Sequence, residues 1–240
     1  MTDLDSPATA SGHRQNRVDP WGVLRAVPHR GTRMGNRGIL HLGQHVVRPW
    51  AHKAWVHCVL DATFQKRRPF SPNTYSELFF LDEATALAAG HRPCRSCQRQ
   101  RHVQFNTLWT QANLGGTADG AGRGIAPVAT IDATLHAERI GPGKAKRTSE
   151  ATVASLPAGA MFAHAGLAWL RWPQDGAGQG DCLPWSFNGY GSAEPLAPNT
   201  TVQVLTPPSI VHTLRAGYVP QVHSSAQTAA TATASPLGHP

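Results

Sequence analysis

A pair of cysteines two residues apart constrains this chain more than any other feature. Cys94 and Cys97 follow a short alanine-rich segment that stops at Gly90, and Pro93 directly precedes the first of them. A tight Cys-x-x-Cys turn lets both sulfur atoms face one metal ion, as in half of a tetrahedral zinc site. A reduced thiol pair or a redox dithiol is the alternative, but a redox pair usually opens a helix after a strand, whereas this pair follows a predicted helix and a proline. We therefore expect a metal knuckle that holds Zn²⁺.

The candidates for further ligands lie upstream. Cys58 stands in the apolar run 54–60, which predicts a buried strand, and simple burial is the alternative for a lone cysteine there. If Cys58 faces the metal, the adjacent His57 points to the opposite face of the strand. His41, near an expected strand end, is then favoured as the fourth ligand. Cys182 is expected to be an isolated thiol.

The predicted elements around the knuckle are both strands and helices. The sequence predicts a strand at 75–81 and a helix at 84–89 that Asp82 caps. Apolar spacing predicts a second helix over 98–112. In the second half, the expected elements are helices at 130–139 and 209–216 and short strands at 161–163, 168–172 and 201–205. We expect an α+β fold: a small mixed sheet with helices around the Cys-x-x-Cys knuckle, followed by a β-rich C-terminal unit.

Composition shifts suggest the boundaries of these units. Polar or Ala/Thr/Ser-rich ends predict disordered tails, and a Gly/Ala-rich segment in the middle predicts a linker or long loop. The expected divisions are a tail at 1–18, a metal-binding domain at 19–114, a linker at 115–124, the β-rich unit at 125–223 and a tail at 224–240.

Charge and cysteine content indicate the compartment and the partners. The 240 residues contain four cysteines, and we see neither a secretory signal nor an apolar run long enough for a membrane span. We expect a cytoplasmic protein with reduced thiols and no membrane partner. The net charge of +8 favours an anionic partner, nucleic acid and DNA in particular, with mere solubility as the alternative.

The basic residues gather near the knuckle, where no acidic residue occurs between positions 84 and 118. Arginine forks match phosphate oxygens, so these residues are candidates for nucleic-acid contact, with a solvated surface as the alternative. The candidates are Arg92, Arg95, Arg99 and Arg101 beside the knuckle, and Lys66, Arg67 and Arg68 in an upstream loop.

Segment 79–98, FFLDEATALAAGHRPCRSCQ, resembles the metal-binding module of Ada-type methylphosphotriester repair proteins. The resemblance implies that Cys94 and Cys97 are zinc ligands and that the protein takes part in DNA repair. That family carries two further cysteines, spaced Cys-x-x-x-Cys, and one of them accepts a methyl group from DNA. Cys58 would take the first position, but Ala62 stands at the second. The overall layout is more similar to a bacterial family that shares this knuckle.

The sequence thus predicts an Ada-like zinc-binding protein that contacts DNA or RNA through a basic surface beside the metal. A classical enzyme is not expected, and methyl transfer to a catalytic Cys58 is one alternative. A non-catalytic protein-interaction module stabilised by zinc is another. A metal-dependent hydrolase is less favoured, because His136 and Glu138 are two positions apart and do not share a helix face.

Overall fold

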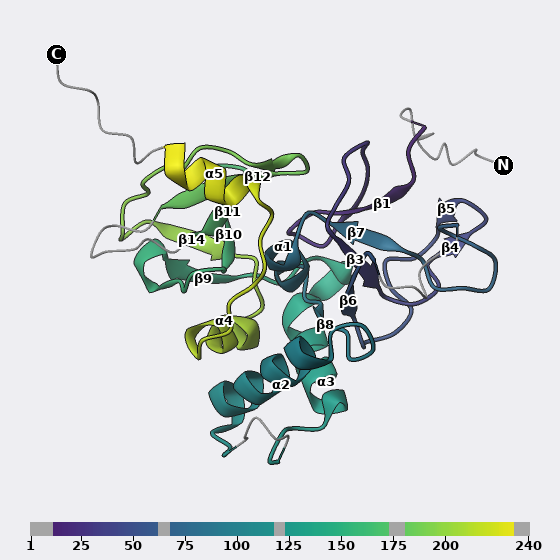
Figure 1. The fold of residues 1–240 in the computed structure, drawn as a ribbon, viewed down its shortest axis with the longest axis horizontal. Helices are drawn as coiled ribbons and strands as arrows, with labels where there is room; N and C mark the ends of the chain where they lie inside the picture. The colour runs from purple at the N-terminus through teal and green to yellow at the C-terminus, as the bar shows by residue number, and fades with distance from the viewer. Residues whose placement is uncertain (1–11, 62–67, 118–122, 173–180, 233–240) are drawn as a thin grey trace.

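The computed structural model describes residues 12–61, 68–117, 123–172 and 181–232. These residues form two six-stranded sheets, and the short helix α1 (Glu83–Ala88) lies between them (Figure 1). One sheet is mixed and comes from the first half of the chain, and the other is antiparallel and comes from the second half. The predicted α+β class is confirmed. Among the described residues, no helix has the length and apolar character needed to span a membrane.

The mixed sheet brings the knuckle beside Cys58. Its order is β2 (Leu24–Ala26), β1 (Gln15–Val18), β7 (Leu78–Phe80), β3 (Arg33–Asn36), β6 (Val56–Val59) and β8 (Arg92–Pro93). β8 is an edge strand that runs parallel to β6, with His57 opposite Pro93. A small hairpin of β4 (His41–Leu42) and β5 (His45–Val46) lies outside this sheet.

The second sheet is antiparallel throughout. Its order is β13 (Gly189–Tyr190), β12 (Cys182–Ser186), β11 (Leu167–Arg171), β10 (Met161–His164), β14 (Thr201–Val204) and β9 (Ser149–Thr152). Two short 3-10 helices, Pro142–Lys144 and Val153–Ser155, flank β9. The β-rich character predicted for this half follows from short alternating strands between Pro and Gly turns.

The predicted cap and stop define α1. The Asp82 side chain accepts a hydrogen bond from Thr85 N at 2.8 Å, which satisfies one of the free N–H groups of the first turn. Gly90 follows the helix with φ of +84°, a left-handed conformation that glycine adopts without strain. Every residue of α1 is buried. Its alanines allow the close approach that a helix between two sheets requires.

The two halves share their cores. Helices α2 (Arg99–Leu114) and α3 (Val128–Arg139) bury Phe105, Trp109 and Ile131 in one cluster with side chains from β10, β14 and α4 (Pro208–Arg215). A second cluster joins Ala84 and Ala88 of α1 to the antiparallel sheet. The predicted split at 115–124 therefore does not separate two independent cores.

Both predicted tails include ordered structure. β1 begins at Gln15, within the predicted N-terminal tail. Helix α5 (Ser225–Ala232) lies within the predicted C-terminal tail and packs on β12 and β13, with Ala226 fully buried. Tyr190 N donates to Ser225 Oγ at 2.9 Å. The small side chains that made this segment look disordered are the ones that fit against the sheet.

Candidate metal centre

Three cysteine sulfur atoms lie together beside the edge of the mixed sheet. The Sγ atoms of Cys58, Cys94 and Cys97 all lie within 4.8 Å of one another. Cys58 comes from β6, and the knuckle follows the adjacent strand β8. Cys94 N donates to His57 O at 2.9 Å, which continues the pairing of the two strands to the first knuckle cysteine. The sheet register thus brings together thiols that are 36 positions apart in the sequence.

The knuckle turn supplies amide donors to the sulfur atoms. The backbone N–H groups of Ser96 and Cys97 donate to Cys94, and the N–H group of Val59 donates to Cys97. Gln98 N donates to Cys94 O at 3.1 Å, and the chain enters α2 at Arg99. The pair therefore follows strand β8 and precedes a helix, contrary to the expectation that set it apart from a redox dithiol, and the third sulfur atom of Cys58 is what favours a metal. N–H donors of this kind favour thiolate over thiol, and thiolate is the form that binds a metal.

The three thiols influence one another strongly. Hydrogen bonds from Cys58 and Cys97, helped by the amide donors, hold the pKa of Cys94 well below its usual value. Contacts with Cys94 and Cys97 raise the pKa of Cys58, and burial raises it further. The bond with Cys58 lowers the pKa of Cys97, but Cys94 and burial raise it more. The protein alone therefore favours one thiolate among the three, and a bound divalent cation would allow all three to ionise.

The sulfur group is buried on one side and open on the other. Cys58 is only 4% exposed, whereas Cys94 and Cys97 are half-buried. The sulfur predicted to accept a methyl group is thus the least accessible of the three. Cys182 lies buried on β12 and is not part of the group. The three cysteines could hold a metal ion, and their partly exposed side faces solvent.

His41, the predicted fourth ligand, does not join this group. Its Nδ1 lies 2.6 Å from Ser76 Oγ, and its ring stacks on Phe70 at a centroid distance of 4.6 Å. His57 points away from the sulfur atoms, as strand alternation predicts: its Nε2 lies 3.4 Å from Glu83 Oε1.

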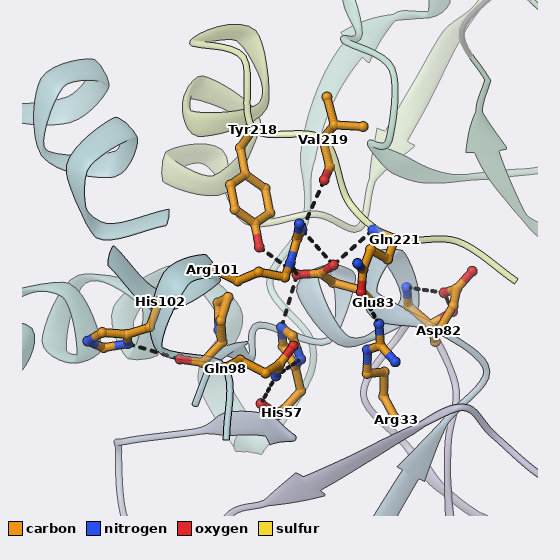
Figure 2. A network of polar contacts seen from close by, with 12 residues as sticks. Arg33, His57, Asp82, Glu83, Gln98, Arg101, His102, Tyr218, Val219 and Gln221 are labelled. Atoms are coloured by element: carbon orange, nitrogen blue, oxygen red, sulfur yellow. Dashed lines mark hydrogen bonds and ion pairs between the residues drawn. The ribbon is translucent and has the colours of Figure 1, made fainter. Parts of the chain in front are cut away.

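The buried Glu83 is the centre of a network of polar contacts (Figure 2). Arg101 donates to its Oε2 at 2.7 Å, and Tyr218 Oη donates to its Oε1 at 2.5 Å. Gln221 N donates to Oε2 at 2.8 Å. Burial alone would raise the pKa of Glu83, but His57, Arg101 and Tyr218 together lower it to about 2. Glu83 therefore stays ionised and ties α1, α2 and the segment after α4 together.

Gln98 connects this network to the knuckle, and His102 of α2 contacts the backbone just before the knuckle. The amide Nε2 of Gln98, the residue after Cys97, donates to His57 O at 2.9 Å (Figure 2). His102 Nδ1 lies 3.1 Å from Pro93 O, one residue before Cys94. These two contacts hold the backbone next to Cys58 and Cys94, and neither of them reaches a sulfur atom. Local sequence patterns did not indicate this role for Glu83 or Tyr218, because their contact spans 135 positions.

The candidate phosphate-binding residues fall into two groups. Arg92 is buried and makes a bidentate ion pair with Asp132, in which both N–O distances are 2.8 Å. Arg101 is bound to Glu83 as described above, so neither is free for a phosphate. Arg95 and Arg99 are exposed beside the knuckle, and Arg68 is exposed on the loop before Phe70. Lys66 and Arg67 lie outside the described residues.

The fold and the site together define a class of protein: an α+β protein with a group of three cysteines that could hold a metal ion. No family model matches the chain, and neither a curated protein nor a solved structure matches it. The Ada-type resemblance therefore rests on the residues around the knuckle alone.

Proposed function

We propose that this chain is a zinc-binding protein whose ligands include Cys58, Cys94 and Cys97. The observation that carries the proposal is the convergence of three sulfur atoms, from two separate segments, to within 4.8 Å of one another. Thiolate sulfur is a soft ligand that suits zinc, and Cys-rich sites with amide donors to sulfur are typical of structural zinc. Three protein ligands leave one position for a water molecule or another donor, in contrast to the four protein ligands of most structural zinc sites.

The proposed zinc has a structural role. It would join β6 to the turn that starts α2, and so close a loop of 36 positions. Metal binding of this kind contributes directly to the free energy of folding, because the unfolded chain has no assembled site.

We also propose that the surface around the knuckle contacts the phosphate backbone of nucleic acid. Arg95 and Arg99 are exposed on either side of Cys97, and Arg68 is exposed as well. Guanidinium groups suit phosphate oxygens, and the net charge of +8 would attract a polyanion. Ada-like DNA repair is the biological setting that the knuckle sequence suggests.

Metal analysis of purified protein tests the zinc proposal. Wild-type protein should contain about one zinc per chain, and Cys97→Ser should lose most of it. Cys182→Ala is the matched control, because this cysteine is outside the group, and it should retain its zinc. A wild-type protein without metal, or equal zinc in wild type and Cys97→Ser, would contradict the proposal.

Fluorescence anisotropy with labelled DNA and RNA oligonucleotides tests the nucleic-acid contact. The double variant Arg95→Met, Arg99→Met should bind more weakly, and the slope of log affinity against log salt should fall by about 2. Arg215→Met is an exposed control on α4 that removes a charge elsewhere. No binding by the wild type, or equal affinity in the double variant and the control, would exclude this contact and favour a protein partner.

A further inference from the structure

A second feature of the molecule lies apart from the sulfur group. An open cavity of about 440 Å³ is lined by residues of the mixed sheet, by the segment 46–50 and by the end of α3 with the residues that follow it. Five of its lining residues are cationic and none is acidic. The five are Arg37, Arg48, Arg139, Lys144 and Lys146.

Arg37 is buried at this cavity with one donor group unused. It is only 1% exposed. Its Nε lies 3.1 Å from His91 Nε2, and its Nη1 donates to Gly22 O at 3.0 Å. Its Nη2 has no hydrogen-bond partner among the described residues. A buried guanidinium group without a carboxylate partner is costly, so the unused and buried Nη2 of a residue beside the cavity indicates a missing acceptor.

Arg139 adds a second buried guanidinium at the same place. It is also 1% exposed, and it donates to Gly90 O at 2.7 Å and to Lys53 O at 2.6 Å. Arg37 and Arg139 both lie over the ring of Trp55, with their Cζ atoms 4.0 and 3.8 Å from its centroid. Neutral carbonyl groups and an aromatic face hold these two cations, and no described carboxylate forms an ion pair with either.

Arg37, Arg139 and Lys146 form a cluster of cationic residues that nearby negative charges do not balance. Lys146 Nζ donates to Ala88 O at 2.6 Å, again to a neutral acceptor. Burial lowers the pKa of Arg37 and of Arg139 to about 9, and burial next to these arginines lowers the pKa of Lys146 to about 7. The two carboxylates that act electrostatically on these cations are already paired elsewhere, Asp19 with Arg25 and Asp132 with Arg92. The positive charge beside this cavity is therefore not balanced by a free carboxylate, and a bound anion would relieve this cost.

The remaining lining suggests what the anion is attached to. Trp50 is half-buried at the cavity, with Lys144 Nζ 5.9 Å from its ring centroid, and Trp21 also lines the space. Flat aromatic surfaces beside cations suit a planar ring that carries a negative group. The volume lies in the range of small-molecule sites and exceeds what a bare phosphate needs.

We propose that this cavity binds a nucleoside phosphate, with the phosphate at Arg37, Arg139 and Lys146 and the ring against Trp50. The ligand is either a free nucleotide or the phosphorylated end of a strand, which share this chemistry. The inference does not depend on zinc, because none of these residues belongs to the sulfur group.

Isothermal titration calorimetry tests the proposal. It measures the affinity of the full chain for adenosine 5′-monophosphate, for adenosine and for inorganic phosphate. The nucleotide should bind at least about 10-fold more tightly than either of its parts. Arg37→Met and Lys146→Met should each weaken binding by a similar factor, whereas Arg95→Met, a control beside the knuckle, should not. Circular dichroism establishes that the variants fold, and Lys146→Met carries the test if Arg37→Met does not fold.

A thymidine tetranucleotide, with and without a 5′-phosphate, separates the two sources. Tighter binding of the phosphorylated strand than of the mononucleotide identifies a strand end, and the reverse order identifies a free nucleotide. Absence of saturable binding of both at about 1 mM, or unchanged affinity in Lys146→Met, would overturn the proposal. Zinc measured in the same samples keeps the two proposals apart: nucleotide binding without zinc contradicts only the metal centre, and zinc without nucleotide binding contradicts only the cavity.

Discussion

At the scale of single residues, buried charges decide much of this structure. Glu83 looks in the sequence like an ordinary acid in the first turn of a helix, where the helix dipole favours it. In the structure it is fully buried and contacts Arg101, His57 and Tyr218. Local sequence could predict that an acid belongs there. It could not show which distant groups surround the acid.

The low pKa of Glu83 gives a pH prediction. Because the folded-state pKa of about 2 lies below the ordinary value of 4.5, its stabilisation is complete above about pH 4.5 and declines as the pH falls toward 2. Glu83→Gln should be less stable than wild type at pH 6. The gap in free energy of unfolding should shrink by about 2 kcal/mol between pH 6 and pH 3. Urea unfolding of both proteins measures it, and a gap independent of pH would contradict the network.

At the scale of elements, the end of α1 links both proposed sites. The carbonyl oxygen of Gly90 accepts a hydrogen bond from Arg139. The next residue, His91, contacts Arg37. The same short peptide leads into Cys94 and Cys97. The sequence predicted the helix, its cap and its stop correctly, because these depend on neighbours along the chain. It did not predict that Gly90 packs against an arginine 49 positions away.

Gly90→Ala tests this packing. The change places a side chain at a φ of +84°, and the new Cβ would lie 2.5 Å from Arg139 Cδ. We expect a loss of about 2–3 kcal/mol in the free energy of unfolding. Gly217→Ala is the matched control, since Gly217 has a φ of +102° and nothing within 4 Å of its Cβ position. That variant should lose only about 1 kcal/mol, and equal losses would show that Arg139 does not constrain Gly90.

Helix α5 allows a second test at this scale. Deletion of residues 224–240 removes the buried Ala226 and the contact of Ser225 with Tyr190. The thermal midpoint should fall by roughly 4–8 °C, which corresponds to about 2 kcal/mol for a chain of this length. Deletion of residues 233–240 alone keeps α5 intact and serves as the control. An unchanged midpoint in the longer deletion would mean that α5 does not stabilise the fold.

At the scale of the whole molecule, the second half supports the first. Phe105 and Trp109 of α2 share a core with Phe162 and Ile210 from the antiparallel sheet and α4. The sequence predicted the fold class and most elements, because hydrophobic period and turn residues are local signals. It predicted a boundary at 115–124 from a change in composition, and one buried cluster includes side chains from both sides of that segment. Long-range packing determines the shared core, and a single sequence does not reveal it.

For the candidate site, too, local sequence patterns identified some residues, and contacts between distant segments decided the others. Cys94 and Cys97 were recognisable from their spacing, and Cys58 from the strand that carries it. The positions of His41, Arg92 and Arg101 depend on Ser76, Asp132 and Glu83, which no spacing rule connects to them. The central feature of the molecule is the group of three buried or half-buried cysteine sulfur atoms, with the Glu83 network close to it.

X-ray absorption at the zinc edge of the purified protein tests that feature most directly. The account predicts a shell of about three sulfur atoms at roughly 2.3 Å, which is unchanged in Cys182→Ala and is lost together with most of the zinc in Cys97→Ser. A zinc environment of nitrogen and oxygen only, or the absence of bound zinc, would contradict it.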